Sequence, residues 1–298
     1  MIFNQIDIID DQIRVFRDDL FPFLGGGNKG RKIMFIEKDI KQRGCNAVVS
    51  TGGIQSNHCR AVAILAAQNH WACTLVLHGD KERFYSESGN ARIIKTSGAN
   101  VIFVKDASEI SECMDNAMNL YSVKNLNPYY IQGGGHTIDG GLAYIDAVRE
   151  LEQYSISNNW FPEYIFLASG TGSTQAGLLA GVSKYKIPSK VIGISVAREK
   201  YRAEENISNF YTELCSAFNI KRLDNDIIVL DDYLCGGYEK YNPELKKLSL
   251  DSVRKYGFTL DTTYTGKAFY GMLDYIKQNN INSNILFWHT GGIFNFLM

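Results

Sequence analysis

Lys29 is the residue whose surroundings in the sequence most directly suggest chemistry. It follows three consecutive glycines, Gly25–Gly27, which let the backbone turn tightly and leave room for a ligand. A helical pattern of isoleucines begins just after it, so we expect Lys29 at the start of a helix, where the helix dipole disfavours an ammonium ion. Such a lysine is a candidate for a lowered pKa, which an amine nucleophile or a Schiff-base lysine needs. The alternative is a glycine turn followed by a solvated basic face that includes Arg31 and Lys32.

A second candidate is the loop Ser169–Thr174, which is rich in Gly, Ser and Thr and lies between a predicted strand and a predicted helix. Backbone N–H groups and hydroxyls in this position can hold a phosphate. The loop is not a P-loop, because Leu178 and Leu179 follow Gly177 where that motif requires Lys-Ser/Thr. Many hydroxyls without bulk favour a monophosphate. The alternative is a tight strand-to-helix turn that binds nothing.

A third candidate is the loop Gly52–Asn57, which also separates a predicted strand from a predicted helix. Its backbone N–H groups suit a small anion such as a carboxylate, and Ser56 and Asn57 add a hydroxyl and an amide. A helix-capping role for either side chain is the alternative to a catalytic one.

Other loops carry polar or aromatic residues with less specific signals. Gly133–Gly135 is expected to form a wall or a hinge, and His136 is expected to pack or to face solvent. The loop His289–Gly292 follows the last predicted strand and is expected to meet the other loops at one rim. Tyr238 and Tyr264 lie in predicted loops, and each is either a core residue or a functional one. A Schiff-base lysine, a monophosphate loop and a carboxylate-binding loop together describe a pyridoxal phosphate enzyme that acts on an amino acid.

The elements that must position these residues alternate between strands and helices, which predicts right-handed βαβ units and parallel sheets. The predicted strands are 13–16, 46–50, 74–77, 101–104, 129–131, 164–168, 191–196, 227–230 and 285–288. Two such series suggest an α/β fold of two open, twisted parallel-sheet domains with the cofactor cleft between them. We expect residues 1–32 and 136–298 to form a larger cofactor-binding domain, and 33–135 a smaller inserted α/β domain.

The composition excludes several classes of protein. The 298 residues carry a formal net charge of −1 and are 45% hydrophobic, so no basic field points to nucleic acid or to an anionic membrane. No signal-peptide pattern is visible, and no apolar stretch approaches the roughly 18 residues of a membrane span. Six cysteines without a C-x-x-C pair predict reduced thiols in a cytoplasm, and the five scattered histidines show no metal-ligand pattern. We therefore expect a cytoplasmic protein without a metal site.

Nearly the whole chain, from about Phe16 to Ile293, resembles a known family. This family comprises the fold-type II pyridoxal phosphate enzymes called 1-aminocyclopropane-1-carboxylate (ACC) deaminase and D-cysteine desulfhydrase, whose architecture is like that of the tryptophan synthase β subunit. The motifs that carry the resemblance are Gly26-Gly27-Asn28-Lys29-x-Arg31-Lys32, Gly52-Gly53-Ile54-Gln55-Ser56-Asn57, Thr171-Gly172-Ser173-Thr174-Gln175-Ala176-Gly177 and Tyr264-x-Gly266-Lys267.

The resemblance implies a role for each candidate residue. Lys29 would carry the cofactor covalently, and Ser56, Tyr238 and Tyr264 would be catalytic. The residues implied to bind the cofactor, besides Lys29, are Asn57, Gly170, Thr171, Gly172, Ser173, Thr174, Thr265 and Thr290. The residues implied to bind the substrate are Gly53, Gln55, Ser56, Asn57 and His58. A homodimer is likewise implied by the resemblance.

Two positions favour the desulfhydrase within this family. The resemblance implies that deaminases have a Glu directly after the tyrosine at position 264 and a Leu directly after the histidine of the last strand. This chain has Thr265 and Thr290 at these two positions. A carboxylate would keep the pyridine nitrogen protonated, as ring opening of a cyclopropane needs, whereas a hydroxyl suits a good leaving group such as a thiolate. Thr262-Thr263 stands where the family typically has Pro-Val, a difference that the resemblance places near the substrate side.

The sequence thus predicts a pyridoxal phosphate-dependent lyase that performs α,β-elimination on D-cysteine or a related small D-amino acid. Within this chemistry the alternatives are ACC deamination and β-replacement in a specialised pathway. An alternative of another class is a non-catalytic protein that binds a phosphorylated metabolite.

Overall fold

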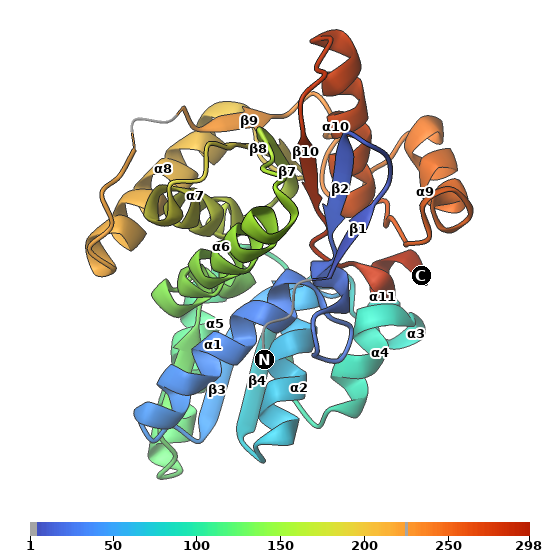
Figure 1. The fold of residues 1–298 in the computed structure, drawn as a ribbon. Helices are drawn as coiled ribbons and strands as arrows, with labels where there is room; N and C mark the ends of the chain where they lie inside the picture. The colour runs from blue at the N-terminus through green and yellow to red at the C-terminus, as the bar shows by residue number, and fades with distance from the viewer. Residues whose placement is uncertain (1–4, 224–225) are drawn as a thin grey trace. The chain divides into compact units, whose positions relative to one another are not determined.

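The computed structural model describes residues 5–223 and 226–298. Its internal contacts divide the chain into two compact units. The first unit contains the residues up to Asn28 together with Gly141–Phe296, and the second contains Lys29–Gly140 with Leu297–Met298. Each unit is an α/β layer structure with its own sheet (Figure 1).

The first unit is built on a six-stranded sheet in the order β1-β2-β10-β7-β8-β9. The strands are β1 (Ile6–Ile8), β2 (Ile13–Phe16), β7 (Tyr164–Ser169), β8 (Lys190–Ser195), β9 (Ile228–Leu230) and β10 (Ile285–Trp288). All neighbours pair in parallel except β1, an edge strand that runs antiparallel to β2 and that the sequence did not predict. The helices are α6 (Ile138–Asn158), α7 (Ser173–Tyr185), α8 (Lys200–Ala217), α9 (Pro243–Tyr256), α10 (Thr265–Gln278) and α11 (Ile293–Phe296), with the 3-10 turn η1 at Asp18–Leu20.

Alternating side chains of these strands form two apolar faces, because successive residues of a strand point to opposite sides. On one face Phe166 and Phe287 belong to the core that contains Phe269 of α10, whose ring stands 5.0 Å from that of Phe287 in a T-shaped pair. On the other face Trp288 packs against Tyr144 of α6, with ring centroids 5.9 Å apart. The sheet is therefore covered on both sides, as parallel sheets generally are.

The second unit has a four-stranded, fully parallel sheet in the order β5-β4-β3-β6. Its strands are β3 (Ala47–Gly53), β4 (Ala72–His78), β5 (Asn100–Val104) and β6 (Pro128–Ile131). Its helices are α1 (Gly27–Gln42), α2 (Asn57–Gln68), α3 (Lys81–Ser86), α4 (Gly89–Thr96) and α5 (Glu109–Val123), with the 3-10 turn η2 at Gly133–Gly135. Ala47 and Val49 of β3 share one core with Met114 and Tyr121 of α5.

Three local predictions need correction. Strand β3 continues through Gly53, because Gly52 and Gly53 pair with Leu77 and His78 of β4, whereas the sequence suggested a break at Thr51. Helix α1 begins at Gly27 rather than near Gly30, which brings Lys29 into its first turn. Helices α3 and α11 are short elements that the sequence did not indicate.

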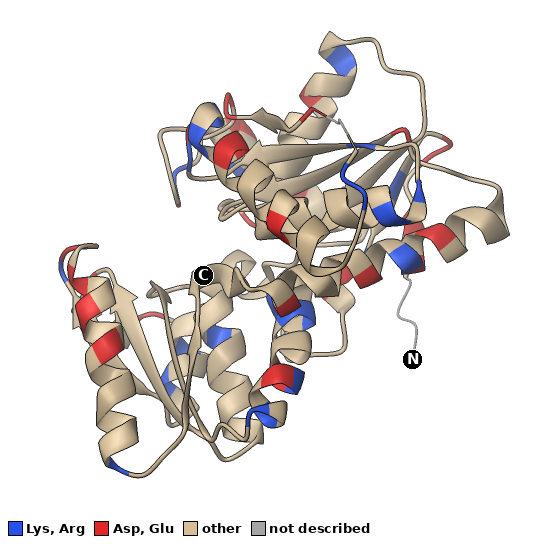
Figure 2. Ribbon diagram, turned by 90° about the vertical axis from the view of Figure 1, so that its left-hand side faces the viewer, with Lys and Arg blue, Asp and Glu red and all other residues tan. Residues whose placement is uncertain are grey.

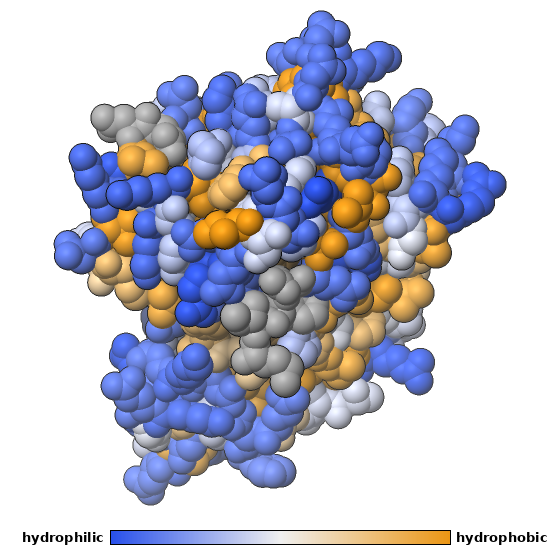
Figure 3. Space-filling model, in the orientation of Figure 1, coloured by the Kyte–Doolittle hydropathy of each residue, from blue (hydrophilic) through white to orange (hydrophobic). Residues whose placement is uncertain are grey.

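The surface mixes both signs of charge and both kinds of polarity. Figure 2 shows acidic and basic residues interspersed along the helices, in keeping with the net charge of −1. On the face drawn in Figure 3, hydrophobic residues form small groups between hydrophilic ones. Within residues 5–223 and 226–298, none of the helices combines the length and the apolar character that crossing a membrane would require.

Candidate active site

Lys29 is the third residue of α1, which confirms its predicted position at the start of a helix. Its ammonium donates to the carbonyl of Gly134 in η2 at 2.9 Å. Burial lowers the pKa of Lys29 from its usual 10.5 to about 8. The direction agrees with the prediction, but desolvation rather than the helix dipole is its cause. At pH 7 roughly a tenth of this amine is therefore neutral, far more than for an ordinary lysine, and the neutral form can act as a nucleophile.

The solvated basic face proposed as an alternative is wrong. Arg31 and Lys32 are both only 1% exposed. Behind them His58 is buried, and desolvation together with the charges of Lys29 and Lys32 lowers its pKa well below 6.5. His58 is thus neutral and adds no further positive charge to those of Lys29, Arg31 and Lys32.

The tautomer of His58 follows from its partner. Ser50 Oγ donates to the carbonyl of Ile131 at 2.8 Å, and the same oxygen lies 2.8 Å from His58 Nε2. Since a hydroxyl has one hydrogen, Ser50 Oγ accepts from His58 Nε2–H, and Nδ1 is the unprotonated ring nitrogen. A contribution of His58 to substrate binding would then be made as an acceptor at Nδ1.

The loop between β3 and α2 is shaped by Ser56 and Gly52. Ser56 is the N-cap of α2 and accepts from Cys59 N–H at 3.2 Å, so the capping role considered for it is real. A Cβ at position 52 would lie 2.7 Å from Ser56 Oγ, and therefore only glycine fits beneath this hydroxyl. Capping uses the hydroxyl as an acceptor and leaves its chemistry as a donor intact.

Residues of α4 and of the segment before it hold this loop in place. The Gln55 amide donates to Glu87 Oε2 at 2.7 Å and to the Ser88 carbonyl at 3.1 Å. Asn90 Nδ2 donates to the Gln55 carbonyl at 3.1 Å and to Asn57 Oδ1 at 3.0 Å. The bond from Asn90 fixes the Asn57 amide with Nδ2 on the side away from Asn90. With its side chain engaged in this way, Gln55 could serve a substrate only through its backbone N–H.

In the first unit, the loop Gly170–Thr174 connects β7 to α7 as predicted. Gly172 is the N-cap of α7 with φ of 87°, a conformation that favours glycine, and no side chain caps the helix. The first turn of α7 contains no acidic residue. The hydroxyls of Thr171 and Ser173 lie 3.2 Å apart, and Asn28 Nδ2 donates to Thr174 Oγ1 at 3.1 Å. Backbone and side-chain donors thus gather at one helix start, the arrangement that binds anions.

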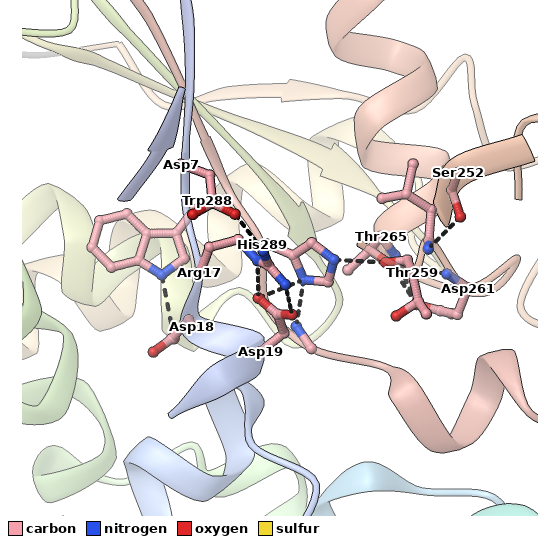
Figure 4. A network of polar contacts seen from close by, with 12 residues as sticks. Asp7, Arg17, Asp18, Asp19, Ser252, Thr259, Asp261, Thr265, Trp288 and His289 are labelled. Carbon is pink, nitrogen blue, oxygen red and sulfur yellow. Dashed lines mark hydrogen bonds and ion pairs between the residues drawn. The ribbon is translucent and has the colours of Figure 1, made fainter. Parts of the chain in front are cut away.

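Within the first unit, the loop His289–Gly292 contacts Gly27 and Asn28. Asn28 N–H donates to the Thr290 carbonyl at 2.9 Å, and a Cβ at Gly27 would lie 2.7 Å from the same oxygen. His289 donates from Nε2 to the Thr259 carbonyl at 2.7 Å, and its Nδ1 lies 3.5 Å from Asp19 Oδ1 (Figure 4). These contacts join the loop to Asp19 and Asn28, near the start of the chain, and to Thr259, which lies before α10.

A buried carboxylate that the sequence analysis missed lies beside this loop. Asp261 Oδ1 accepts from the N–H groups of Thr263 and Tyr264, both at 2.8 Å. Its Oδ2 accepts from Thr265 N–H at 3.1 Å and from the Thr265 hydroxyl at 2.8 Å (Figure 4). Burial nevertheless raises the pKa of Asp261, although these hydrogen bonds oppose the shift. An Asp shortly before a helix is a capping signal that could have revealed it.

Tyr238 and Tyr264 form a pair in the first unit. Their hydroxyls are hydrogen-bonded to each other, and their rings stand 5.9 Å apart in a T-shaped arrangement. Burial, followed by the proximity of Tyr238, raises the pKa of Tyr264 well above 10. Lys267 of α10 donates to the carbonyls of Leu234 and Gly237, each at 2.8 Å, and so anchors the turn that carries Tyr238. The hydroxyl of Tyr264 is therefore protonated at neutral pH.

Comparison with known proteins identifies the family. The chain matches the family model described as pyridoxal-phosphate dependent enzyme over residues 10–291. The chain belongs to this family. It is 30% identical over 292 residues to D-cysteine desulfhydrase of Yersinia enterocolitica serotype O:8 / biotype 1B, with 96% of this chain and 88% of that protein covered.

One further relative and one solved structure are also similar to this chain. The chain is 33% identical over 285 residues to a Pyrococcus abyssi protein named "Putative 1-aminocyclopropane-1-carboxylate deaminase", with 94% of this chain and 84% of that protein covered. A crystal structure of an ACC deaminase homologue matches with a TM-score of 0.87 and 28% identity, covering 98% of this chain and 93% of that one. The predicted fold class and the predicted cofactor, pyridoxal phosphate, are thereby confirmed. The protein is an enzyme and not a non-catalytic metabolite-binding protein.

The residues of both units fit the chemistry of this cofactor. Pyridoxal phosphate has an aldehyde, for which a desolvated amine such as that of Lys29 is the appropriate partner. It also has a phosphate, for which the uncapped and acid-free start of α7 is the appropriate partner.

Proposed function

We propose that this enzyme eliminates sulfide from D-cysteine, or from a related small D-amino acid, to give pyruvate and ammonia. The observation that carries the proposal is Thr265, which has a hydroxyl where a deaminase-like carboxylate would lie. That hydroxyl is engaged with Asp261. A neutral hydroxyl stabilises a protonated pyridine nitrogen less than a carboxylate does, which suits the departure of a thiolate better than the opening of a carbon ring.

Residues of both units would hold the cofactor. Lys29 would carry it through the aldehyde, and the loop Gly170–Thr174 would bind the phosphate with N–H groups and hydroxyls. Asn57, with Nδ2 directed away from Asn90, would donate to the ring hydroxyl. Thr265 and Thr290 would contact the ring from the first unit. When bound, the cofactor supplies an aldehyde that joins the substrate amine and a ring that withdraws electrons from the α-carbon.

The substrate carboxylate would bind at the start of α2. Ser56 and the N–H groups of Gly53–Asn57 lie at this helix start, and the positive end of the helix dipole favours an anion there. Gln55 would take part through its backbone N–H and His58 through Nδ1.

Lys29 and the tyrosine pair would then move the protons. Once its amine is released by the substrate, Lys29 takes the α-proton, for which a pKa of about 8 is well matched. The bond from the β-carbon to sulfur breaks with its electron pair on sulfur. Tyr264 or Tyr238 donates the proton that the leaving thiolate takes up, since the raised pKa of Tyr264 keeps its hydroxyl protonated. Released 2-aminoacrylate adds water and loses ammonia to give pyruvate.

ACC deamination is the second candidate, because one of the relatives at similar identity carries that name. β-Replacement is a third, since it shares every step up to loss of the thiolate. We further propose that the enzyme is cytoplasmic, in keeping with its six free cysteines. We also propose that it is a homodimer and that the molecules it binds are small amino acids.

The decisive experiment follows the visible absorbance of the purified enzyme and its products. D-cysteine, L-cysteine and ACC are supplied in parallel, and 2-oxo acid, ammonia and sulfide are measured. Sulfide and pyruvate from D-cysteine at the highest kcat/KM support the proposal, whereas turnover of ACC alone contradicts it. A new amino acid formed in place of pyruvate when a second thiol is added would indicate β-replacement.

Substitution of Lys29 tests the same proposal at the residue level. Lys29→Ala is expected to lose both the visible band and turnover, and Lys38→Ala, an exposed lysine of the same helix, to keep both. Turnover retained by Lys29→Ala would refute the assignment.

A further inference from the structure

Arg198 is a cation beside the loop Gly170–Thr174 that the sequence motifs did not reveal. It lies after β8, in the connection to α8, and its side chain is half-buried. Its Nη1 donates to the carbonyl of Gly170. Both residues belong to the first unit.

The local backbone holds Arg198 in this position. Ser195 Oγ accepts from Arg198 N–H at 3.1 Å and donates to the Arg198 carbonyl at 2.5 Å, which closes a tight turn at the end of β8. Ser195 is in turn the register partner of Ser169, the last residue of β7, and Val196 N–H donates to the Ser169 carbonyl at 3.1 Å. The turn with the arginine and the loop Gly170–Thr174 therefore start from paired residues of adjacent strands.

The bond to Gly170 acts on the N–H group of Thr171. The Gly170 carbonyl and the Thr171 N–H belong to one peptide unit, which is trans because the described chain contains no cis peptide. In a trans peptide the carbonyl and the N–H point in opposite directions. An arginine that holds the carbonyl on one side thus directs the N–H to the other side, and it polarises that N–H into a stronger donor.

The charge of Arg198 is not neutralised by neighbouring side chains. Across the described part of the chain no carboxylate forms an ion pair with it, and the charge that acts on it most is that of Arg202 on α8. Burial and this like charge both lower the pKa of Arg198. The first turn of α7 adds no acid. The guanidinium of Arg198 is thus free of a carboxylate partner among the described residues, and a dianionic phosphate would balance its charge.

We propose that Arg198 is a positioning residue for the cofactor phosphate: through the Gly170 carbonyl it orients and strengthens the Thr171 N–H donor, and its guanidinium charge offsets the phosphate. This inference rests on the proposed function, in which the loop Gly170–Thr174 binds the phosphate.

The test compares pyridoxal phosphate with pyridoxal, which has the same aldehyde and ring but no phosphate. The full-length protein is freed of cofactor, and the dissociation constant of each compound is measured from the visible absorbance of the bound form. The variants are Arg198→Gln, Arg198→Lys and the control Arg222→Gln. Arg222 is an arginine of the same unit that donates to Ser208 and Thr212 and forms no ion pair among the described residues.

Arg198→Gln is expected to weaken pyridoxal phosphate binding about tenfold, as the loss of a hydrogen bond from a charged group implies, and to leave pyridoxal binding unchanged. Arg198→Lys should restore part of the loss, and Arg222→Gln should have no effect on either compound. Equal weakening of both compounds by Arg198→Gln would reduce the residue to a structural role and overturn the inference. Unchanged binding of both would overturn it too. If the unsubstituted protein did not prefer pyridoxal phosphate to pyridoxal, the phosphate loop of the proposed function would itself be wrong.

Discussion

Thr265 donates its hydroxyl hydrogen to Oδ2 of the buried Asp261 at 2.8 Å, and the same hydroxyl accepts from Asp261 N–H at 3.1 Å. Both hydrogen-bonding functions of the threonine are thus used within a single turn at the start of α10. A hydroxyl held in this way can offer a pyridine nitrogen only a lone pair or a shared proton, and Asp261 decides which. In the proposed cofactor site, the protonation of the ring nitrogen would therefore depend on Asp261 as well as on Thr265.

Substitution of Thr265 should separate the hydroxyl from the shape of its side chain. Thr265→Val deprives the buried Asp261 carboxylate of one donor, which should lower the free energy of unfolding by about 1–3 kcal/mol. Thr265→Ser keeps the donor and should cost less. Urea denaturation of both variants measures the difference. Equal losses for Val and Ser would show that the bond to Asp261 contributes nothing.

Removal of either hydroxyl of the tyrosine pair should slow turnover to a similar extent. Tyr238→Phe and Tyr264→Phe each break the bond between the hydroxyls and are expected to lower kcat on D-cysteine about 10²-fold, the lower range for a general acid, because a thiolate leaves readily. The double variant should be little worse than either single one, since both act through one shared proton. Effects that multiply in the double variant would mean that the tyrosines act independently.

The sequence predicted the arrangement of strands well because buried parallel strands contain short runs of apolar residues. The runs that became β3, β7, β8 and β10 are all of this kind. The end of β3 was missed because glycine carries no strand signal, although Gly52 and Gly53 pair with β4. Edge strand β1 has only three residues, too few for a periodic pattern.

The candidate site could be predicted where its chemistry is local in sequence. Lys29 beside Gly25–Gly27 and the run Gly170–Thr174 are such local signals. The burial of Arg31 could not be foreseen, because a charged residue in sequence reads as exposed until tertiary contacts cover it. The contact of Arg198 with Gly170 joins residues 28 positions apart and has no signature in either segment.

Gly292 should be intolerant of any side chain. Its φ is 99°, and a Cβ would lie 2.2 Å from Asp261 Oδ2. Gly257 has a similar φ of 76°, but no atom lies within 4 Å of a Cβ built there. A substitution at Gly257 therefore measures the cost of the backbone conformation without a steric clash. We expect Gly257→Ala to cost about 1 kcal/mol and Gly292→Ala about 3 kcal/mol, because overpacking is added. Equal thermal shifts in the two variants would argue against the close contact with Asp261.

Asn90 should influence the cofactor without contacting it. Asn90→Ala removes the donors to the Gln55 carbonyl and to Asn57 Oδ1, so the Asn57 amide loses the bond that holds its Oδ1. Pyridoxal phosphate and pyridoxal should then both bind about tenfold more weakly, since the ring contact and not the phosphate is affected. Asn69→Ala is the control, because Asn69 makes comparable bonds to Glu37 and Leu65. An effect on pyridoxal phosphate alone would contradict this role.

The stability of the protein freed of cofactor should depend on pH through Lys29. Burial lowers its pKa to about 8 from the 10.5 expected in the unfolded chain. Between these two values the unfolded chain binds more protons than the folded one, so the free energy of unfolding should rise as the pH increases from 8 to 10.5. Lys29→Met should abolish this contribution and stabilise the protein below pH 8, because no ammonium is then desolvated. Urea denaturation across this pH range, with Lys38→Met as the control that keeps the rise, measures the effect. An identical pH dependence in Lys29→Met would place the neutral amine elsewhere and remove the physical basis for Lys29 as the nucleophile.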